Sequence, residues 1–176
     1  MKRMLWWILS LVFLFGFLTA SAENMGPFPT LGISDTSFLL NLQNDLTSVF
    51  GYGVISTEGL KISEDEISWK ISPATQIIAN VQDGEIQHIR VFGGKDLNNS
   101  IELILVGSCT ISALYDGKIN LDRACAVLLQ ALDKEAFVAD DMRFRMGSSG
   151  VDTDYELVIA PEALFRDDNQ TKGEEE

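Results

Sequence analysis

The hydrophobic positions of residues 35–50 recur at the three- and four-residue spacing of an amphipathic helix. Within DTSFLLNLQNDLTSVFG, this apolar stripe consists of Phe38, Leu39, Leu42, Leu46, Val49 and Phe50. Asp35 or Thr36 is expected to cap the start of the helix, and Gly51 is expected to end it. We therefore predict a helix that packs on the protein core, although the same stripe would also suit a partner protein.

After Tyr52 the period changes from helical to alternating and stays so to Phe92. In EISWKIS, the apolar residues Ile67, Trp69 and Ile71 alternate with polar ones, which is typical of a strand with one buried face. We expect Trp69 to lie in the core.

Two further strand patterns, TQIIANV and IQHIRVF, flank the hairpin signal Asp83-Gly84. A two-residue loop would oppose Ile77 to Arg90, whereas a three-residue loop would oppose Ile77 to Val91 and keep one face apolar. The sequence therefore predicts a bulged hairpin with Gly84 at positive φ. The opposite face would carry Ile78, Asn80, His88 and Arg90.

Two helices are predicted after the hairpin. Asn99 and Glu102 resemble a capping box, and the IELILVGSCTISAL segment that follows is apolar almost all round, so this helix should be largely buried as far as Asp116-Gly117. A second helix is expected after Asn120, over LDRACAVLLQALDKEAF. Its stripe consists of Leu121, Ala124, Cys125, Leu128 and Leu132.

The only two cysteines of the chain, Cys109 and Cys125, each lie eight residues from Gly117. In an antiparallel helical hairpin about Gly117 they would stand at the same height, so we predict a Cys109–Cys125 disulfide. One alternative is a pair of reduced core cysteines. The other is a redox-active dithiol, which the missing adjacent spacing and the apolar surroundings disfavour.

The C-terminal part contains two more alternating segments, 142–146 and 155–159, joined by a Gly147–Gly150 loop. Arg143 and Arg145 share one face of the first segment. That face would pair with Glu156 across the hairpin or bind an anion, and cross-strand pairing is the simpler interpretation.

These patterns predict an α+β fold: a single domain with an antiparallel β-sheet, and with the N-terminal helix and the helical hairpin packed on one face. The opposite face would be open and polar. It would carry the candidate binding residues His88, Arg90, Arg143 and Arg145, with Lys70 as a further candidate.

The chain of 176 residues divides into four expected segments. Residues 1–22 resemble a secretory signal peptide, because Lys2 and Arg3 precede an apolar run that ends in Ala20-Ser21-Ala22. We expect an extended lead-in over 23–34, the α+β domain over 35–165, and an acidic disordered tail over 166–176. The predicted product is exported to the periplasm or the extracellular space.

Charge narrows the range of partners. The net charge is −13, and removal of the two basic residues with the signal peptide would bring it to −15. Such a chain is repelled by nucleic acid and anionic bilayers, so we expect no nucleic-acid binding and no membrane insertion after signal cleavage. A protein or peptide partner fits better, and the sequence does not indicate an oligomeric state.

The sequence predicts no catalytic constellation, no metal site and no cofactor. His88 is the only histidine, which excludes histidine-rich metal sites. The acidic stretches 63–66 and 152–154 lack the loop length and glycine of an EF-hand. We therefore expect a non-catalytic binding domain. The alternative is a small secreted hydrolase that uses His88 with an unassigned carboxylate or serine.

Overall fold

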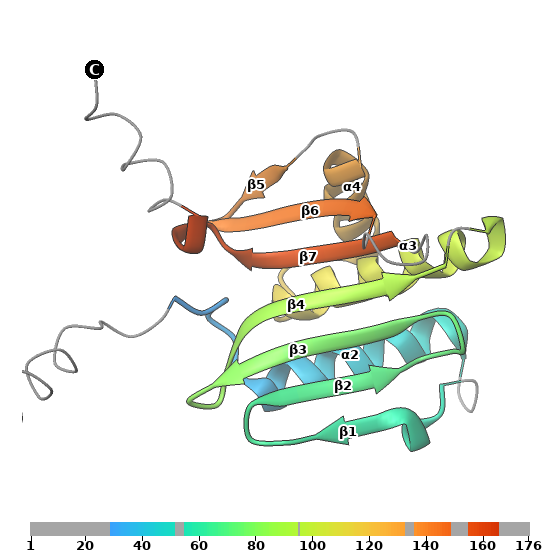
Figure 1. Ribbon diagram of the computed structural model, residues 1–176, viewed down its shortest axis with the longest axis horizontal. Helices are drawn as coiled ribbons and strands as arrows, with labels where there is room; N and C mark the ends of the chain where they lie inside the picture. The colour runs from blue at the N-terminus through green and yellow to red at the C-terminus, as the bar shows by residue number, and fades with distance from the viewer. Residues whose placement is uncertain (1–28, 52–54, 95, 133–135, 149–154, 166–176) are drawn as a thin grey trace, which may run out of the picture.

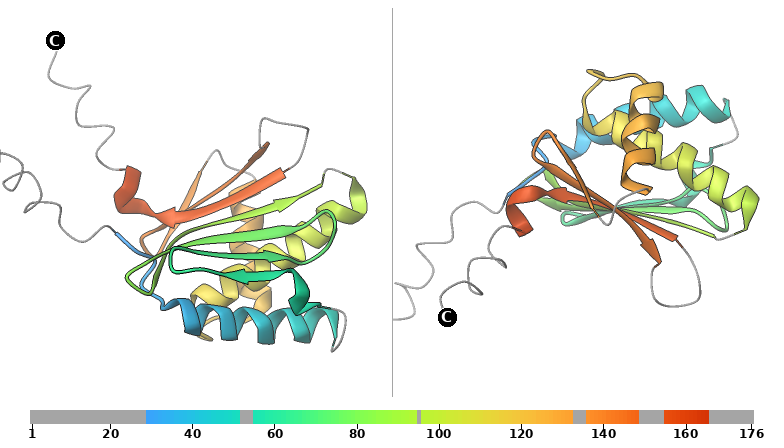
Figure 2. Two further views of the ribbon diagram at one scale, coloured as in Figure 1. Left: turned by 60° about the horizontal axis from the view of Figure 1, so that its bottom comes forward. Right: turned by 90° about the horizontal axis from the view of Figure 1, so that it is seen from above.

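The computed structural model describes residues 29–51, 55–94, 96–132, 136–148 and 155–165. These residues form one antiparallel sheet of seven strands, in the order β1-β2-β3-β4-β7-β6-β5, and all three helices cover the same face of it (Figures 1 and 2). The predicted single α+β domain is therefore confirmed. The predicted signal peptide and acidic tail lie outside the described residues, as do the first residues of the lead-in.

The helices are α2 (Asp35–Phe50), α3 (Leu97–Leu114) and α4 (Leu121–Leu132). The strands are β1 (Leu60–Ile62), β2 (Glu66–Lys70), β3 (Gln76–Gln82), β4 (Glu85–Gly93), β5 (Phe137–Ala139), β6 (Met142–Ser148) and β7 (Tyr155–Pro161). Two short 3-10 helices, η1 (Thr57–Gly59) and η2 (Glu162–Phe165), precede β1 and follow β7.

The path of the chain explains why the helices share a face. Strands β1 to β4 form a meander, and the chain then leaves the sheet through α3 and α4 before it returns at the far edge as β5. Strands β6 and β7 lead back toward the centre, where β7 pairs with β4. Both crossover helices therefore pack on the side where α2 already lies (Figure 2, right).

Helix α2 agrees closely with its pattern. Phe38, Leu42 and Leu46 are buried, and Gly51 ends the helix with a φ of 89° while its N–H donates to the Thr47 carbonyl. The N-cap is Ser34, one residue before the predicted position, and its hydroxyl accepts a hydrogen bond from the Ser37 N–H. Ser34 was a suitable cap by residue type, since a hydroxyl can accept from the first turn as well as a carboxylate can.

Both crossover helices differ from their predicted bounds. Helix α3 begins at Leu97, because Asp96 rather than Asn99 is the N-cap and accepts from the Asn99 N–H. Helix α4 starts after Asn120 as predicted, and Asn120 Oδ1 accepts from the Arg123 N–H. It ends at Leu132, however, and Phe137 already begins strand β5, so the helical prediction ran too far.

The β3–β4 hairpin confirms the register predicted from its hydrophobic face. Ile77 lies opposite Val91, and Ile78 lies opposite Arg90. The turn itself has two residues, Asp83 (φ 52°) and Gly84 (φ 77°), both in the left-handed region that a tight hairpin turn requires. A register shift between Asn80 and Val81 then moves the pairing by one residue. The register that opposes Ile77 to Val91 therefore arises from a bulge within the strands and not from a three-residue loop.

The core lies between the inner face of the sheet and the helices. Its largest fully buried side chains are Trp69, Phe38, Phe144, Leu42 and Leu46. Trp69 is 1% exposed, as predicted, and its indole Nε1 donates to the Ser56 carbonyl at 3.1 Å. Strands β2, β3, β4, β7 and β6 contribute alternate residues to this layer, so the inner face is apolar across these five strands.

Helix α3 is the most deeply packed helix. It is the one described helix that is long and apolar enough to cross a membrane, with 18 residues and a mean hydropathy of 1.3, but 56% of it is buried inside the protein. Its length and composition therefore fit a central core helix, since it packs between α2 and α4 and lies on β4.

The predicted disulfide is absent. Cys109 and Cys125 are both free cysteines, the first buried and the second half-buried. The disulfide was predicted from the height of each cysteine along the hairpin. The direction of each side chain around its helix also decides whether the two sulfur atoms can meet.

The direction of Cys109 follows from its neighbours on α3. Gly107 faces α4 and β7, because a Cβ atom at this position would lie 3.3 Å from Leu128 and 3.2 Å from Leu157. Two residues along a helix turn the side chain by about 200°, so Cys109 points to the other side of α3. There it lies near the Asp45 carboxylate of α2. Burial, with a smaller contribution from Asp45, raises the pKa of Cys109 to about 12, which leaves it a protonated core thiol.

Candidate binding face

The outer face of the sheet, on the side away from the helices, is defined by the strand alternation. Residues directly opposite each other on paired strands share a face, and Ile67, Ile77, Val91 and Leu157 mark the inner one. The residues between them therefore project outward. Figure 2 (right) shows α2, α3 and α4 on the other side, so no described α-helix covers this one, although η2 places Glu162 and Phe165 beside Arg143.

One register row crosses almost the whole outer face. It runs through Lys61, Ser68, Ile78, Arg90, Val158 and Arg145, from β1 to β6. Neighbouring strands lie about 4.8 Å apart, so Arg90 is about 14 Å from Lys61 and about 10 Å from Arg145 along this row. Three cationic side chains thus stand in line across the sheet.

The predicted candidate residues all belong to this face. Arg143 lies on it through its pairing with Ala160, His88 lies opposite Asn80, and Lys70 lies opposite Gln76. Lys61 is a further member that the sequence pattern did not reveal, because its strand has only three residues. The alternation of Leu60, Lys61 and Ile62 was the available signal, but three positions are too few to distinguish a strand from a loop.

Basic residues are concentrated on the outer face. It carries Lys61, Lys70, Arg90, Arg143 and Arg145, and the only Lys or Arg elsewhere in the described residues are Lys118 and Arg123. The carboxylates on this face are Glu66, Glu85, Glu156 and Glu162, whereas the other described Asp and Glu residues lie elsewhere. Among the described residues, the outer face therefore carries five of the seven Lys and Arg side chains.

Two of the arginines are held by carboxylates and aromatic rings. Arg90 Nε lies 2.5 Å from Glu156 Oε1, and its guanidinium lies 4.7 Å from the centre of the Phe92 ring. Arg143 forms a bidentate pair with Glu162, at 2.7 and 3.0 Å, and stacks 4.4 Å from the Phe165 ring. The hydrogen bond that Arg143 donates to Glu162 raises the pKa of Arg143 further above its ordinary value.

These ion pairs correct the predicted partner of Glu156. Pairing with Arg143 or Arg145 was expected from the C-terminal hairpin, but Glu156 pairs with Arg90 on the other neighbouring strand. Strand β7 lies between β4 and β6, so Arg90 and Arg145 are both diagonal neighbours of Glu156. The stacking of Arg90 on Phe92 favours the β4 side. Within the described part of the chain, Arg145 makes no ion pair.

His88 lies half-buried on the outer face. Burial, and to a smaller extent the charge of Arg90, lowers the pKa of His88 below its ordinary value of 6.5, so the imidazole is neutral at pH 7. Among the described residues, no carboxylate or serine makes a hydrogen bond to it. The partner that a His88-based hydrolase requires is therefore not supplied by this part of the chain.

Among the described residues, no group of three His, Cys, Asp or Glu side chains is arranged to hold a metal ion. The acidic stretch 152–154 lies outside those residues. In the stretch 63–66, the Asp65 carboxylate instead accepts a hydrogen bond from the Ser63 hydroxyl at 2.9 Å. This contact is typical of a tight turn.

Comparison with protein-family models finds no match, and neither a search of curated proteins nor a search of solved structures finds one.

Proposed function

We propose that the protein is an exported, non-catalytic binding domain whose outer sheet face binds an acidic segment of a partner protein or peptide. The observation that carries this proposal is the concentration of the described Lys and Arg side chains on the face that no described α-helix covers. Complementary charge steers a partner toward such a face and selects its orientation.

The structure of the face favours an extended acidic segment over a small anion. Lys61, Arg90 and Arg145 are spread along one row and do not converge on a single point. Arg145 is free of ion pairs within the described residues, so it would engage a new carboxylate without breaking an existing contact. Nucleic acid is a poorer match, because the net charge of −13 opposes a phosphate backbone.

A charge-reversal pair with a matched control tests this proposal. Lys70→Glu with Arg145→Glu changes the outer face, and Lys118→Glu with Arg123→Glu makes the same change of net charge elsewhere. The probe is a fluorescein-labelled oligoglutamate peptide, and its binding is followed by fluorescence anisotropy at low salt. We expect the outer-face variant to weaken binding by about tenfold and the control by less than about twofold.

Equal losses in the two variants would contradict the proposal, because the peptide would then respond only to net charge. Arg90 is deliberately left unchanged, since a glutamate at position 90 would face Glu156 and disturb the sheet. Circular dichroism of both variants establishes that the fold is kept.

Export is the second part of the proposal, and it is supported by the sequence of residues 1–22. Intact mass of protein from the native host, with and without alkylation, tests it. We expect a mature chain that begins at Glu23 and carries two free thiols. A chain that retains residues 1–22 would contradict export, and a two-hydrogen mass deficit would contradict the free cysteines.

A further inference from the structure

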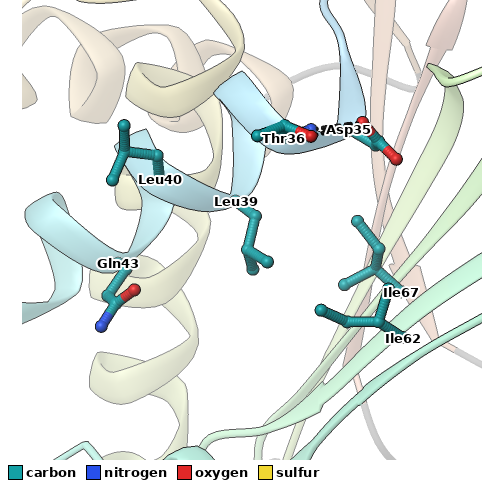
Figure 3. Close-up of a pocket in the computed structure, with 7 residues that line it drawn as sticks. All are labelled: Asp35, Thr36, Leu39, Leu40, Gln43, Ile62 and Ile67. Atoms are coloured by element: carbon teal, nitrogen blue, oxygen red, sulfur yellow. Dashed lines mark hydrogen bonds between the residues drawn. The ribbon is translucent and has the colours of Figure 1, made fainter.

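An apolar groove lies on the helix side of the sheet, where α2 passes the edge strand β1. It has a volume of about 360 Å³ and is lined by Asp35, Thr36, Leu39, Leu40, Gln43, Ile62 and Ile67. Figure 3 shows Leu39 pointing from α2 toward the space beside Ile62 and Ile67. Leu40 and Ile62 are 58% and 61% exposed, so the groove presents large apolar side chains to solvent.

The groove borders a free strand edge. Strand β1 is the last strand of the sheet in the described residues, and Ile62 lies at its end. The Ser63 N–H donates to the Glu66 carbonyl, which makes Ser63–Glu66 a hydrogen-bonded pair of the antiparallel ladder. Because such pairs alternate with non-bonded ones, the backbone groups of Leu60 and Ile62 do not face β2. The Leu60 N–H already donates to the Thr57 carbonyl, so the Leu60 carbonyl and both backbone groups of Ile62 face the free edge.

The charges beside the groove are acidic. Asp35 lines it at the start of α2, and the turn that joins Ile62 to Ile67 carries Glu64 and Asp65. No Lys or Arg is among the described residues that line the groove. An occupant with a basic residue next to its apolar residues would therefore complement this end of the groove.

A second copy of the chain fits this edge poorly. Pairing two β1 strands around Lys61 would oppose Lys61 to its own copy and Glu58 to Glu64 of the partner subunit. Like charges directly opposite each other destabilise a strand pair, and both molecules also carry a large negative charge. A segment of opposite charge avoids both costs.

We propose that the groove between α2 and β1 binds an extended segment of a partner protein, in which alternating apolar residues are followed by a basic residue. The segment adds a strand to β1 through the N–H and carbonyl of Ile62 and the carbonyl of Leu60. Its apolar side chains lie against Leu39, Leu40 and Ile62, and its basic end lies near Asp35 and Glu64. This site is separate from the outer face and takes a partner of the opposite charge.

The test uses short labelled peptides of alternating valine and serine. One peptide ends in two lysines, a second ends in two glutamates, and a third repeats the lysine peptide with an N-methylated central residue that cannot complete the ladder. We expect the unmodified protein to bind the lysine peptide at least about tenfold more tightly than either of the others.

Protein variants then locate the binding site. Ile62→Gln and Leu40→Gln alter exposed side chains, so the fold should survive, and each should weaken binding of the lysine peptide by about tenfold. Glu64→Lys should shift the preference toward the glutamate peptide. The matched control is Val138→Gln, which changes an exposed apolar residue on the other edge strand and should have no effect.

Several results would overturn the proposal. Equal binding of the lysine and glutamate peptides, or unchanged binding by Ile62→Gln, would exclude the groove as a site for a basic segment. Self-association of the protein that Ile62→Gln abolishes, seen by analytical ultracentrifugation, would mean that the occupant is a second copy. None of these outcomes bears on binding at the outer face, so either proposed site can be contradicted without the other.

Discussion

The inner and outer faces of the sheet are formed by the same strands but differ in burial and in charge. On the inner face, residues such as Trp69, Ile77 and Phe144 are fully buried against the helices. On the outer face, Lys61, Arg90 and Arg145 stand in line on a surface that no described α-helix covers. Because side chains alternate between the two faces along each strand, successive residues belong in turn to the core and to the proposed binding face.

The largest expected effect lies on the inner face. Trp69→Ala should lower the free energy of unfolding by about 3 to 5 kcal/mol, because it removes a fully buried aromatic ring and leaves a cavity. It also removes the hydrogen bond to the Ser56 carbonyl. Urea unfolding, followed by circular dichroism, measures the loss. Lys61→Ala on the outer face is the control and should change stability by less than about 0.5 kcal/mol.

A smaller effect on stability is expected at an ion pair on the outer face. Arg143 and Glu162 form a bidentate pair whose side chains are 29% and 16% exposed. A double-mutant cycle with Arg143→Ala and Glu162→Ala should give a coupling energy of about 1 kcal/mol, which falls as salt is added. A coupling near zero would mean that this pair contributes nothing to the stability of the face.

The smallest effect concerns His88. Burial lowers its pKa in the folded protein below 6.5, so the unfolded chain takes up the proton first as the pH falls. The folded state should therefore lose stability as the pH falls below 6.5, until the folded-state pKa is passed. His88→Gln should remove this part of the pH dependence.

The measurement is the difference in unfolding free energy between the wild type and His88→Gln, taken from pH 7.5 to pH 5. A difference that grows in favour of the variant as the pH falls is expected. A difference that grows in favour of the wild type would mean that a partner stabilises the charged imidazole and would revive the enzyme alternative.

The sequence was informative wherever a pattern extended over several positions. The α2 stripe, the β3–β4 register and the burial of Trp69 follow from periodicity and from the need to keep one face apolar. Strands β1 and β5 were missed because each has only three residues. A pattern of that length carries too little information to identify a strand.

The predictions were wrong where a contact depended on the direction of a side chain around its helix, or on which of two neighbouring strands supplied the partner. Cys109 and Cys125 were expected to meet, but Gly107 is the residue of α3 that faces α4, which sends Cys109 toward α2. The pairing of Glu156 with Arg90 depended on which strand lies beside β7. Such contacts follow from tertiary packing and not from local sequence.

The most direct test of the central claim is a titration of isotopically labelled protein with the oligoglutamate peptide, followed by two-dimensional NMR. We expect the largest shifts in the resonances of the outer-face row, including those of Lys61, Arg90 and Arg145. The resonances of residues on the helical side, such as Lys118 and Arg123, should not shift. Shifts centred on Lys118 and Arg123, or no shifts at all, would contradict the claim that the outer face is the binding surface.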